Sequence, residues 1–154
     1  MPWTSKCAAT LAGAMTVTIL SGVARGAPPS VAEWDAPSDW RLRPNALSST
    51  NAEHVKRGRS LFMKHCVTCH GSEGRGDGPS ARLHARRSGY APRDLSRPDL
   101  QQSLTDGEMF WKLTNGWRPG GKTVMPGLGD EVSEEDRWRI VLYVRSLAPK
   151  GGVQ

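Results

Sequence analysis

The chain has 154 residues, enough for one domain and a tail, and a formal net charge of +6 at pH 7. Hydrophobic residues make up 37 % of it, so any apolar core is modest. The basic excess permits an acidic partner surface. It is too weak, and too little interleaved with aromatic residues, to indicate a nucleic-acid-binding protein.

The first 26 residues have the layout of a secretory signal peptide. Lys6 precedes an uncharged stretch from Cys7 to Ala24, and cleavage after Gly26 puts small residues at the last and third-last positions. A retained membrane anchor is the alternative, but the stretch of about 18 residues is short for a span and rich in Thr, Ser and Gly. We therefore expect export to the periplasm, with membrane association only through a partner or an uncleaved N-terminal segment.

The mature chain divides into an arm, a domain and a short tail. Residues 27–50 are interrupted by four prolines and show no period, which predicts an irregular N-terminal arm. Trp34 and Trp40 argue against a fully disordered arm, because indole rings favour packing against the domain. The domain is expected over 51–149 and the tail over 150–154.

A helix is predicted to begin after Asn51, a residue type that caps helix N-termini. Its apolar face runs directly into the first cysteine of a short motif and consists of Val55, Gly58, Leu61 and Phe62.

The residues Cys66-Val67-Thr68-Cys69-His70 form a C-x-x-C-H pattern, the attachment site of a c-type haem. On a helix these offsets put both thiols and the imidazole on one face. Two thiols so placed can add to the two vinyl groups of one porphyrin, with the imidazole beneath the iron. The predicted cofactor is one covalently attached haem c, bound by Cys66 and Cys69, with His70 as an iron ligand.

Zinc sites and thioredoxin-like dithiols also use C-x-x-C. A zinc site needs a second ligand pair, but the only other cysteine is Cys7, and the remaining histidines lack the H-x3-5-H spacing. A thioredoxin-like site needs a preceding strand and a βαβ pattern, and neither is visible. Both alternatives are weaker than haem attachment.

After the motif, glycines fill residues 71–79 and predict a loop. A short helix is expected around Pro79–Leu83, and residues 86–104 look loop-like, with two prolines and scattered arginines. No internal repeat is present.

Two further helices are predicted from their start signals. Thr105 begins a capping-box sequence, and the helix that follows should stop at Gly116. Ser133, followed by three acidic residues, begins a closing helix that runs to about Leu147. With no strand pattern of any length, the predicted fold class is all-α.

The order of these features resembles a class I c-type cytochrome, the bacterial mono-haem domain, over about residues 50–149. The most similar stretches are 58–62, 71–79 and 143–147. The resemblance implies a cytochrome c-like fold, a few short helices wrapped around one covalently attached haem. It also implies a crossing of the first and last helices, with Gly58 and Phe62 against Ile140 and Tyr143.

The resemblance further implies a second axial ligand, a methionine on a loop before the final helix. Met125, in a Met-Pro loop, matches this ligand by its position in the chain. A thioether is a soft, neutral ligand, and His/Met coordination raises the reduction potential. Met109, His84 and an open coordination site remain as alternatives. Met63 is excluded, because it lies one turn before the haem cysteines and cannot reach the opposite haem face.

A proline after the haem motif offers its carbonyl to the proximal histidine in the family, and Pro79 matches that position unless it is a plain turn proline. Side chains that could hold the haem propionates are Tyr90, Trp117, Arg86, Arg87, Arg93 and Arg97. For any single arginine, a solvated surface role is the commoner one.

The implied function is transfer of single electrons between redox proteins, such as a dehydrogenase and an oxidase, by an electron carrier that is not itself an enzyme. No catalytic residues are expected, because a six-coordinate iron has no vacant position and nothing else resembles a nucleophile or an acid–base pair. Two alternatives stay open. One is a haem subunit of a larger oxidoreductase complex, and the other is a small-ligand-binding haem protein with a labile methionine.

Overall fold

The structure is a computed structural model that describes residues 34–149. The expected signal peptide, Cys7, the first part of the arm and the tail lie outside the described residues. The helices are α1 Ser38–Arg41, α2 Ala52–His65, α3 Val67–His70, α4 Ala81–Ser88, α5 Pro98–Ser103, α6 Asp106–Asn115 and α7 Glu134–Ser146, with a 3-10 turn, η2, at Pro119–Gly121.

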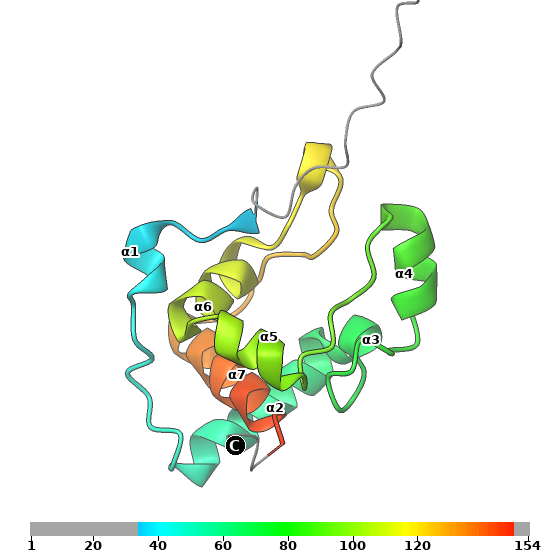
Figure 1. The fold of residues 1–154 in the computed structure, drawn as a ribbon. Coiled ribbons are helices and arrows are strands. Elements are labelled where there is room, and N and C mark those ends of the chain that lie inside the picture. The colour runs from blue at the N-terminus through cyan, green and yellow to red at the C-terminus, as the bar shows by residue number, and fades with distance from the viewer. Residues whose placement is uncertain (1–33, 150–154) are drawn as a thin grey trace, which may run out of the picture.

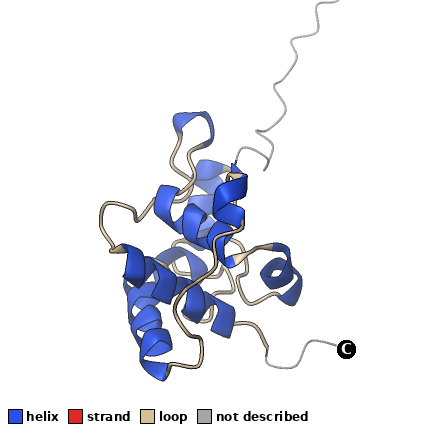
Figure 2. Cartoon of the chain, turned by 90° about the vertical axis from the view of Figure 1, so that its left-hand side faces the viewer, coloured by secondary structure: helices blue, strands red, loops and turns tan. Residues whose placement is uncertain are grey.

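The all-α prediction is confirmed for the described part of the chain, where helices alternate with loops and no strand is present (Figure 2). A single isolated β-bridge joins Trp117 to Met125. None of the described helices is long and apolar enough to cross a membrane.

The centre of the fold is the crossing of α2 and α7 (Figure 1). Asn51 caps α2 as predicted, since its side chain accepts a hydrogen bond of 3.0 Å from the Glu53 amide. The helix backbones lie close together at Gly58, where an added Cβ would lie 2.7 Å from the carbonyl carbon of Arg139. The Phe62 and Tyr143 rings meet beside this point at 5.2 Å, so the predicted crossing is confirmed.

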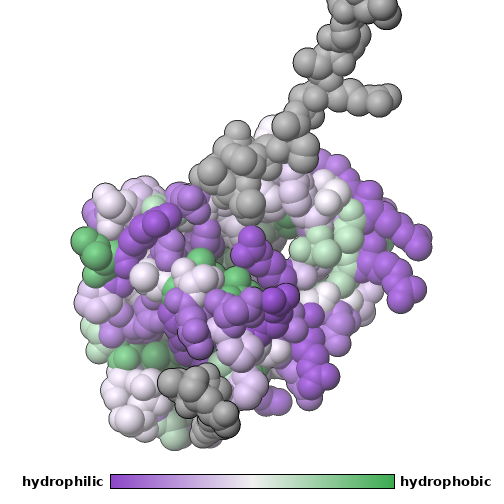
Figure 3. Space-filling model, viewed as in Figure 1, coloured by the Kyte–Doolittle hydropathy of each residue, from purple (hydrophilic) through white to green (hydrophobic). Residues whose placement is uncertain are grey.

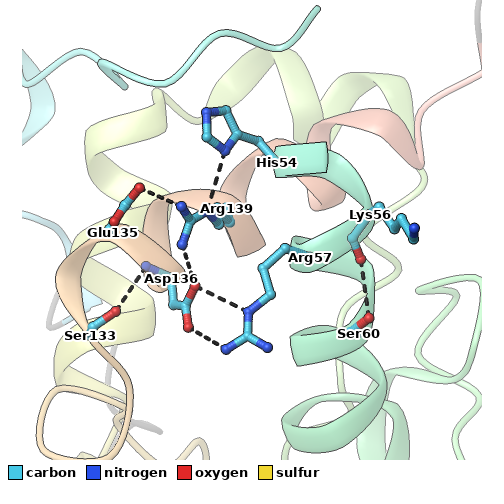
Figure 4. Close-up of polar contacts among 8 residues, drawn as sticks. All are labelled: His54, Lys56, Arg57, Ser60, Ser133, Glu135, Asp136 and Arg139. Carbon is cyan, nitrogen blue, oxygen red and sulfur yellow. Dashed lines mark hydrogen bonds and ion pairs between the residues drawn. The ribbon is translucent and has the colours of Figure 1, made fainter. Parts of the chain in front are cut away.

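An ion-pair network links α2 to α7 at one end of this crossing (Figure 4). Arg57 on α2 donates two hydrogen bonds to the Asp136 carboxylate, at 2.7 and 3.3 Å, and Arg139 donates a third at 2.7 Å. The hydrogen bond from Arg57 is the main reason that the pKa of Asp136 lies below its usual value. The contribution of this ion pair to the free energy of unfolding is present at neutral pH and is lost as acid protonates the carboxylate.

Helix α6 packs on the other side of α7. The predicted capping box is confirmed: the Glu108 amide donates to the Thr105 hydroxyl at 3.1 Å, and the Glu108 carboxylate accepts from the Thr105 amide at 2.8 Å. Phe110 on α6 stacks on Trp138 of α7, with ring centroids 4.0 Å apart. The side chains that are fully buried in this core are Phe62, Phe110, Ile140 and Val141.

The segment between the motif and α6 is more ordered than predicted. Helix α4 begins later than expected and continues to Ser88, and α5 occupies part of the segment that looked loop-like. Pro98 is in the first turn of α5, where its missing N–H costs nothing. The Gln101 amide then fixes α5 to the core by donating to the carbonyls of Leu95 and Val144, at 2.5 and 3.0 Å.

Candidate haem site

Cys66, Cys69 and His70 lie together where α2 ends and α3 begins. The two helices are nearly continuous, because the Cys66 amide donates to the Phe62 carbonyl at 2.8 Å and the His70 amide donates to the Cys66 carbonyl at 2.9 Å. Within residues 34–149 neither cysteine is in a disulfide, and all three side chains are half-buried and line one cavity. The structure therefore brings the motif residues together as the sequence predicted.

The cavity has a volume of about 700 Å³, within the range of sites for large organic ligands. Its walls come from all the α-helices except α1 and from the loops at 89–95 and 124–128, and they are mainly apolar. In Figure 3 a hollow with pale and green atoms separates the main body from the hydrophilic side chains on the right. The apolar walls include Phe62, Leu113, Leu128, Ile140, Val141 and Val144.

The imidazole of His70 is oriented by the main chain. Its Nδ1 atom lies 3.1 Å from the carbonyl oxygen of Arg93. A carbonyl only accepts hydrogen bonds, so Nδ1 carries the proton and Nε2 keeps a free lone pair. Burial lowers the pKa of His70, partly opposed by this hydrogen bond, and so favours the neutral form that binds metals.

The prediction that Pro79 offers its carbonyl to His70 is wrong in this structure, where Arg93 takes that place. Pro79 is exposed and does not line the cavity. The flanking amides of Gly78 and Ser80 donate to the carbonyls of Cys69 and Thr68, at 3.1 and 2.9 Å, which holds this turn against the α3 backbone.

The glycine loop after the motif positions the Arg93 carbonyl. The Leu95 amide donates to the Gly74 carbonyl at 2.6 Å, and Gly76, at φ +77°, leaves no room for a side chain against Pro92. Close packing of the two segments therefore needs glycine at position 76. The dense glycines were the available sequence signal, but they do not show which distant carbonyl is brought to the histidine.

Burial, with a smaller effect of Cys69, raises the pKa of the Cys66 thiol to about 12. Thioether formation adds an S–H group of this kind across a vinyl double bond of the porphyrin. Among residues 34–149, no three His, Cys, Asp or Glu side chains are grouped so that they could hold a metal ion. The cavity thus fits a porphyrin better than it fits a zinc site.

Met125 lines the same cavity from the loop that follows η2. Its backbone pairs with Trp117: the Trp117 amide donates to the Met125 carbonyl at 2.7 Å, and the Met125 amide donates to the Trp117 carbonyl at 3.1 Å. Gly116, at φ +66°, permits this tight pairing, because an added Cβ would lie 2.7 Å from the carbonyl carbon of Pro126.

The other side chains considered as iron ligands differ in whether they line the cavity. Met109 and His84 also line the cavity, whereas Met63 does not. Met109 is only 8 % exposed and packs within the core.

Of the residues considered for the propionates, Tyr90, Arg93 and Trp117 line the cavity. The indole Nε1 of Trp117 is buried without a hydrogen-bond partner in the described part of the chain. A buried donor of this kind fits a carboxylate of the cofactor. Arg86, Arg87 and Arg97 are exposed and are not lining residues, and Arg97 pairs with Asp99 at 2.5 Å.

Sequence reasoning missed several residues at the cavity, among them one from the arm and one from α6. Trp34 from the arm and Lys112 from α6 both line it. Each reaches the cavity through contacts that are distant in sequence, so no local pattern could have found them.

This helical fold, with a C-x-x-C-H motif on a porphyrin-sized cavity, defines a c-type cytochrome domain. The model of the Cytochrome c family matches residues 55–148, and the chain belongs to that family. Cytochrome c550 of Pseudomonas aeruginosa PAO1 is 30 % identical over 114 residues, which cover 71 % of this chain and 68 % of that protein.

Two solved structures are similar. One is the reducing HAO-like protein complex Kustc0457/Kustc0458 of Kuenenia stuttgartiensis, with a TM-score of 0.51 and 26 % identity over 77 % of this chain and 54 % of the matched one. The other is cytochrome cL of Methylophaga aminisulfidivorans, with a TM-score of 0.49 and 24 % identity over 66 % of this chain and 58 % of the matched one. This chain therefore spans little more than half of each.

Family membership establishes the cofactor and the general role. The protein binds haem c covalently and takes part in haem-based electron transfer.

Proposed function

We propose that this protein is an exported carrier of single electrons, with one haem attached through Cys66 and Cys69 and ligated by His70 and Met125. The observation that carries the proposal is that all four side chains line one apolar cavity. When bound, haem supplies reversible one-electron chemistry at its iron.

The residues of this chain control that chemistry in distinct ways. The hydrogen bond to Arg93 holds the His70 ring in one tautomer and one orientation. The neutral thioether of Met125 favours the reduced metal, and the apolar walls limit water around it. A fixed ligand set in a packed cavity favours electron transfer over the binding of small molecules.

The second candidate is a haem subunit of a larger oxidoreductase. It is favoured by the similarity to a chain of the reducing HAO-like protein complex of Kuenenia stuttgartiensis. Purification from the native periplasm separates the two: a stable complex supports the subunit, and a monomeric cytochrome supports the free carrier.

The first prediction concerns haem attachment. In acidified acetone the haem should stay with the wild-type protein, because two thioether bonds hold it. Cys66→Ala or Cys69→Ala should each reduce that retention. Cofactor and protein are measured after separation, and free extraction of haem from the wild type would contradict covalent attachment.

The second prediction concerns the sixth ligand. The ferric protein should show the weak far-red charge-transfer band of His/Met coordination, and Met125→Leu should abolish the band and lower the reduction potential. Met109→Leu and His84→Gln are the matched controls, because both positions also line the cavity. Loss of the band in a control, with retention in Met125→Leu, would assign the ligand to that other residue.

A further inference from the structure

The first described residue of the arm, Trp34, is attached to the loop that carries Met125. Its indole N–H donates to the Gly116 carbonyl at 2.9 Å, and its ring stacks on Trp117 at 5.2 Å with an interplanar angle of 17°. The Lys112 ammonium lies 4.4 Å from the centre of the same ring and also donates to the Trp34 carbonyl. A hydrogen bond, an aromatic stack and a cation–π contact therefore meet at one residue.

These contacts lead directly to the proposed ligand. Trp117 is the residue whose amide and carbonyl pair with Met125, so Trp34 stacks on the bridge partner of Met125. Trp34, Lys112, Trp117 and Met125 all line the haem cavity. Trp34 is thus a part of the cavity wall next to the Met125 loop.

The arm is also fixed at its other end. An added Cβ at Gly107 would lie 3.0 Å from the carbonyl carbon of Trp40 and nearer still to its oxygen, so glycine lets the arm backbone rest directly on α6. The Trp40 ring stacks on Phe110 at 5.7 Å, and the Arg41 guanidinium lies 3.4 Å from the buried Glu108 carboxylate. Residues 34–41 therefore run along α6 in the opposite direction, with Trp34 beside its end and Trp40 and Arg41 beside its start.

At its outer end the Met125 loop is held to α4 by Lys122, whose ammonium donates to the Arg87 carbonyl. Gly120 and Gly121 in η2 have positive φ angles, and neither has a neighbour within 4 Å of the position a Cβ would take. Such a loop loses conformational freedom when it is fixed, and that cost has to be offset by contacts. At its Trp117 end, the loop is covered by two rings: Tyr90 meets Trp117 edge-on at 4.5 Å, and Trp34 stacks on it at 5.2 Å.

We propose that residues 34–41 form a strap and that Trp34 is a positioning residue for the Met125 loop. The strap keeps the thioether at the iron and the cavity closed to small exogenous ligands. This inference rests on the proposed ligation by Met125. It explains how one cytochrome domain selects electron transfer over small-ligand binding through a segment outside the family match at residues 55–148.

The test replaces Trp34 in the holo-protein and measures the ligand itself. Trp34→Ala should weaken the ferric far-red band at neutral pH. It should also raise the rate of carbon monoxide binding to the ferrous protein by about tenfold or more, because a hydrogen bond, an aromatic stack and a cation–π contact are lost together. Leu42→Ala is the matched control, because Leu42 follows the strap and is 84 % exposed. It should leave both signals unchanged.

A second variant releases the strap without touching the cavity wall. Gly107→Ala favours the α6 helix but collides with the Trp40 carbonyl, so it should produce the same two changes. If Trp34→Ala loses helix by circular dichroism, Trp34→Phe takes its place in the test. It keeps an aromatic ring but removes the N–H, so its rate of carbon monoxide binding should lie between those of the wild type and Gly107→Ala.

The outcomes separate the two proposals. A wild type without the far-red band overturns ligation by Met125, and the strap with it. A wild type with the band, and a folded Trp34→Ala variant with an unchanged band and carbon monoxide rate, overturns the strap alone. The same holds if Trp34→Ala unfolds while Trp34→Phe and Gly107→Ala match the wild type.

Discussion

The double variant Cys66→Ser, Cys69→Ser should lose most of its helix in the absence of haem. The cavity of about 700 Å³ lies between α2, α6 and α7 and shares its walls with the core, including Phe62, Ile140 and Val141. At about 24 cal/mol per Å³, an empty space of even half this volume would cost roughly as much as the whole stability of a small domain. Isolated helices as short as these are marginal in water.

Far-ultraviolet circular dichroism of the haem-free double variant measures this effect directly. The haem-loaded wild type, compared at equal concentration, provides the helical reference signal. Native-like helicity with a cooperative thermal transition in the variant would show that the helices build a core of their own, and the explanation would fail.

The parts of the fold that were predictable depend on residues close together in sequence. Asn51, Thr105 and Ser133 each cap a helix within three residues of the side chain, and the structure has all three caps. The three motif residues likewise needed only helical spacing to share one face. Local chemistry was sufficient at each of these positions.

The parts that were missed depend on contacts between distant segments. Helix α5 is held by Gln101 against Val144, 43 residues later, and nothing in its own sequence reveals that anchor. The carbonyl that orients His70 belongs to Arg93, 23 residues away, and not to the nearby Pro79. Trp34 contacts Gly116 across 82 residues. Its tendency to lie against the domain was predictable, but its place beside the haem cavity was not.

Alanine at Gly58 should destabilise the protein, although alanine is the better helix former. An added Cβ would lie 2.7 Å from the Arg139 carbonyl carbon and 3.1 Å from the Tyr143 Cβ, so α2 and α7 must move apart. Overpacking against backbone costs about 1–3 kcal/mol or more, whereas glycine-to-alanine propensity returns about 1 kcal/mol. We expect a net loss of about 1–2 kcal/mol in the free energy of unfolding, because backbone atoms cannot change rotamer to make room.

Guanidinium chloride unfolding of the ferric holo-protein, followed by circular dichroism, gives this difference as a shift of the midpoint at constant slope. Ser60→Ala is the matched control, since Ser60 lies on the same helix and is exposed. Propensity alone predicts that both variants gain stability, and the crossing predicts opposite signs. A Gly58→Ala protein as stable as Ser60→Ala would mean that α2 and α7 can separate without cost, and that the close backbone approach does not stabilise the crossing.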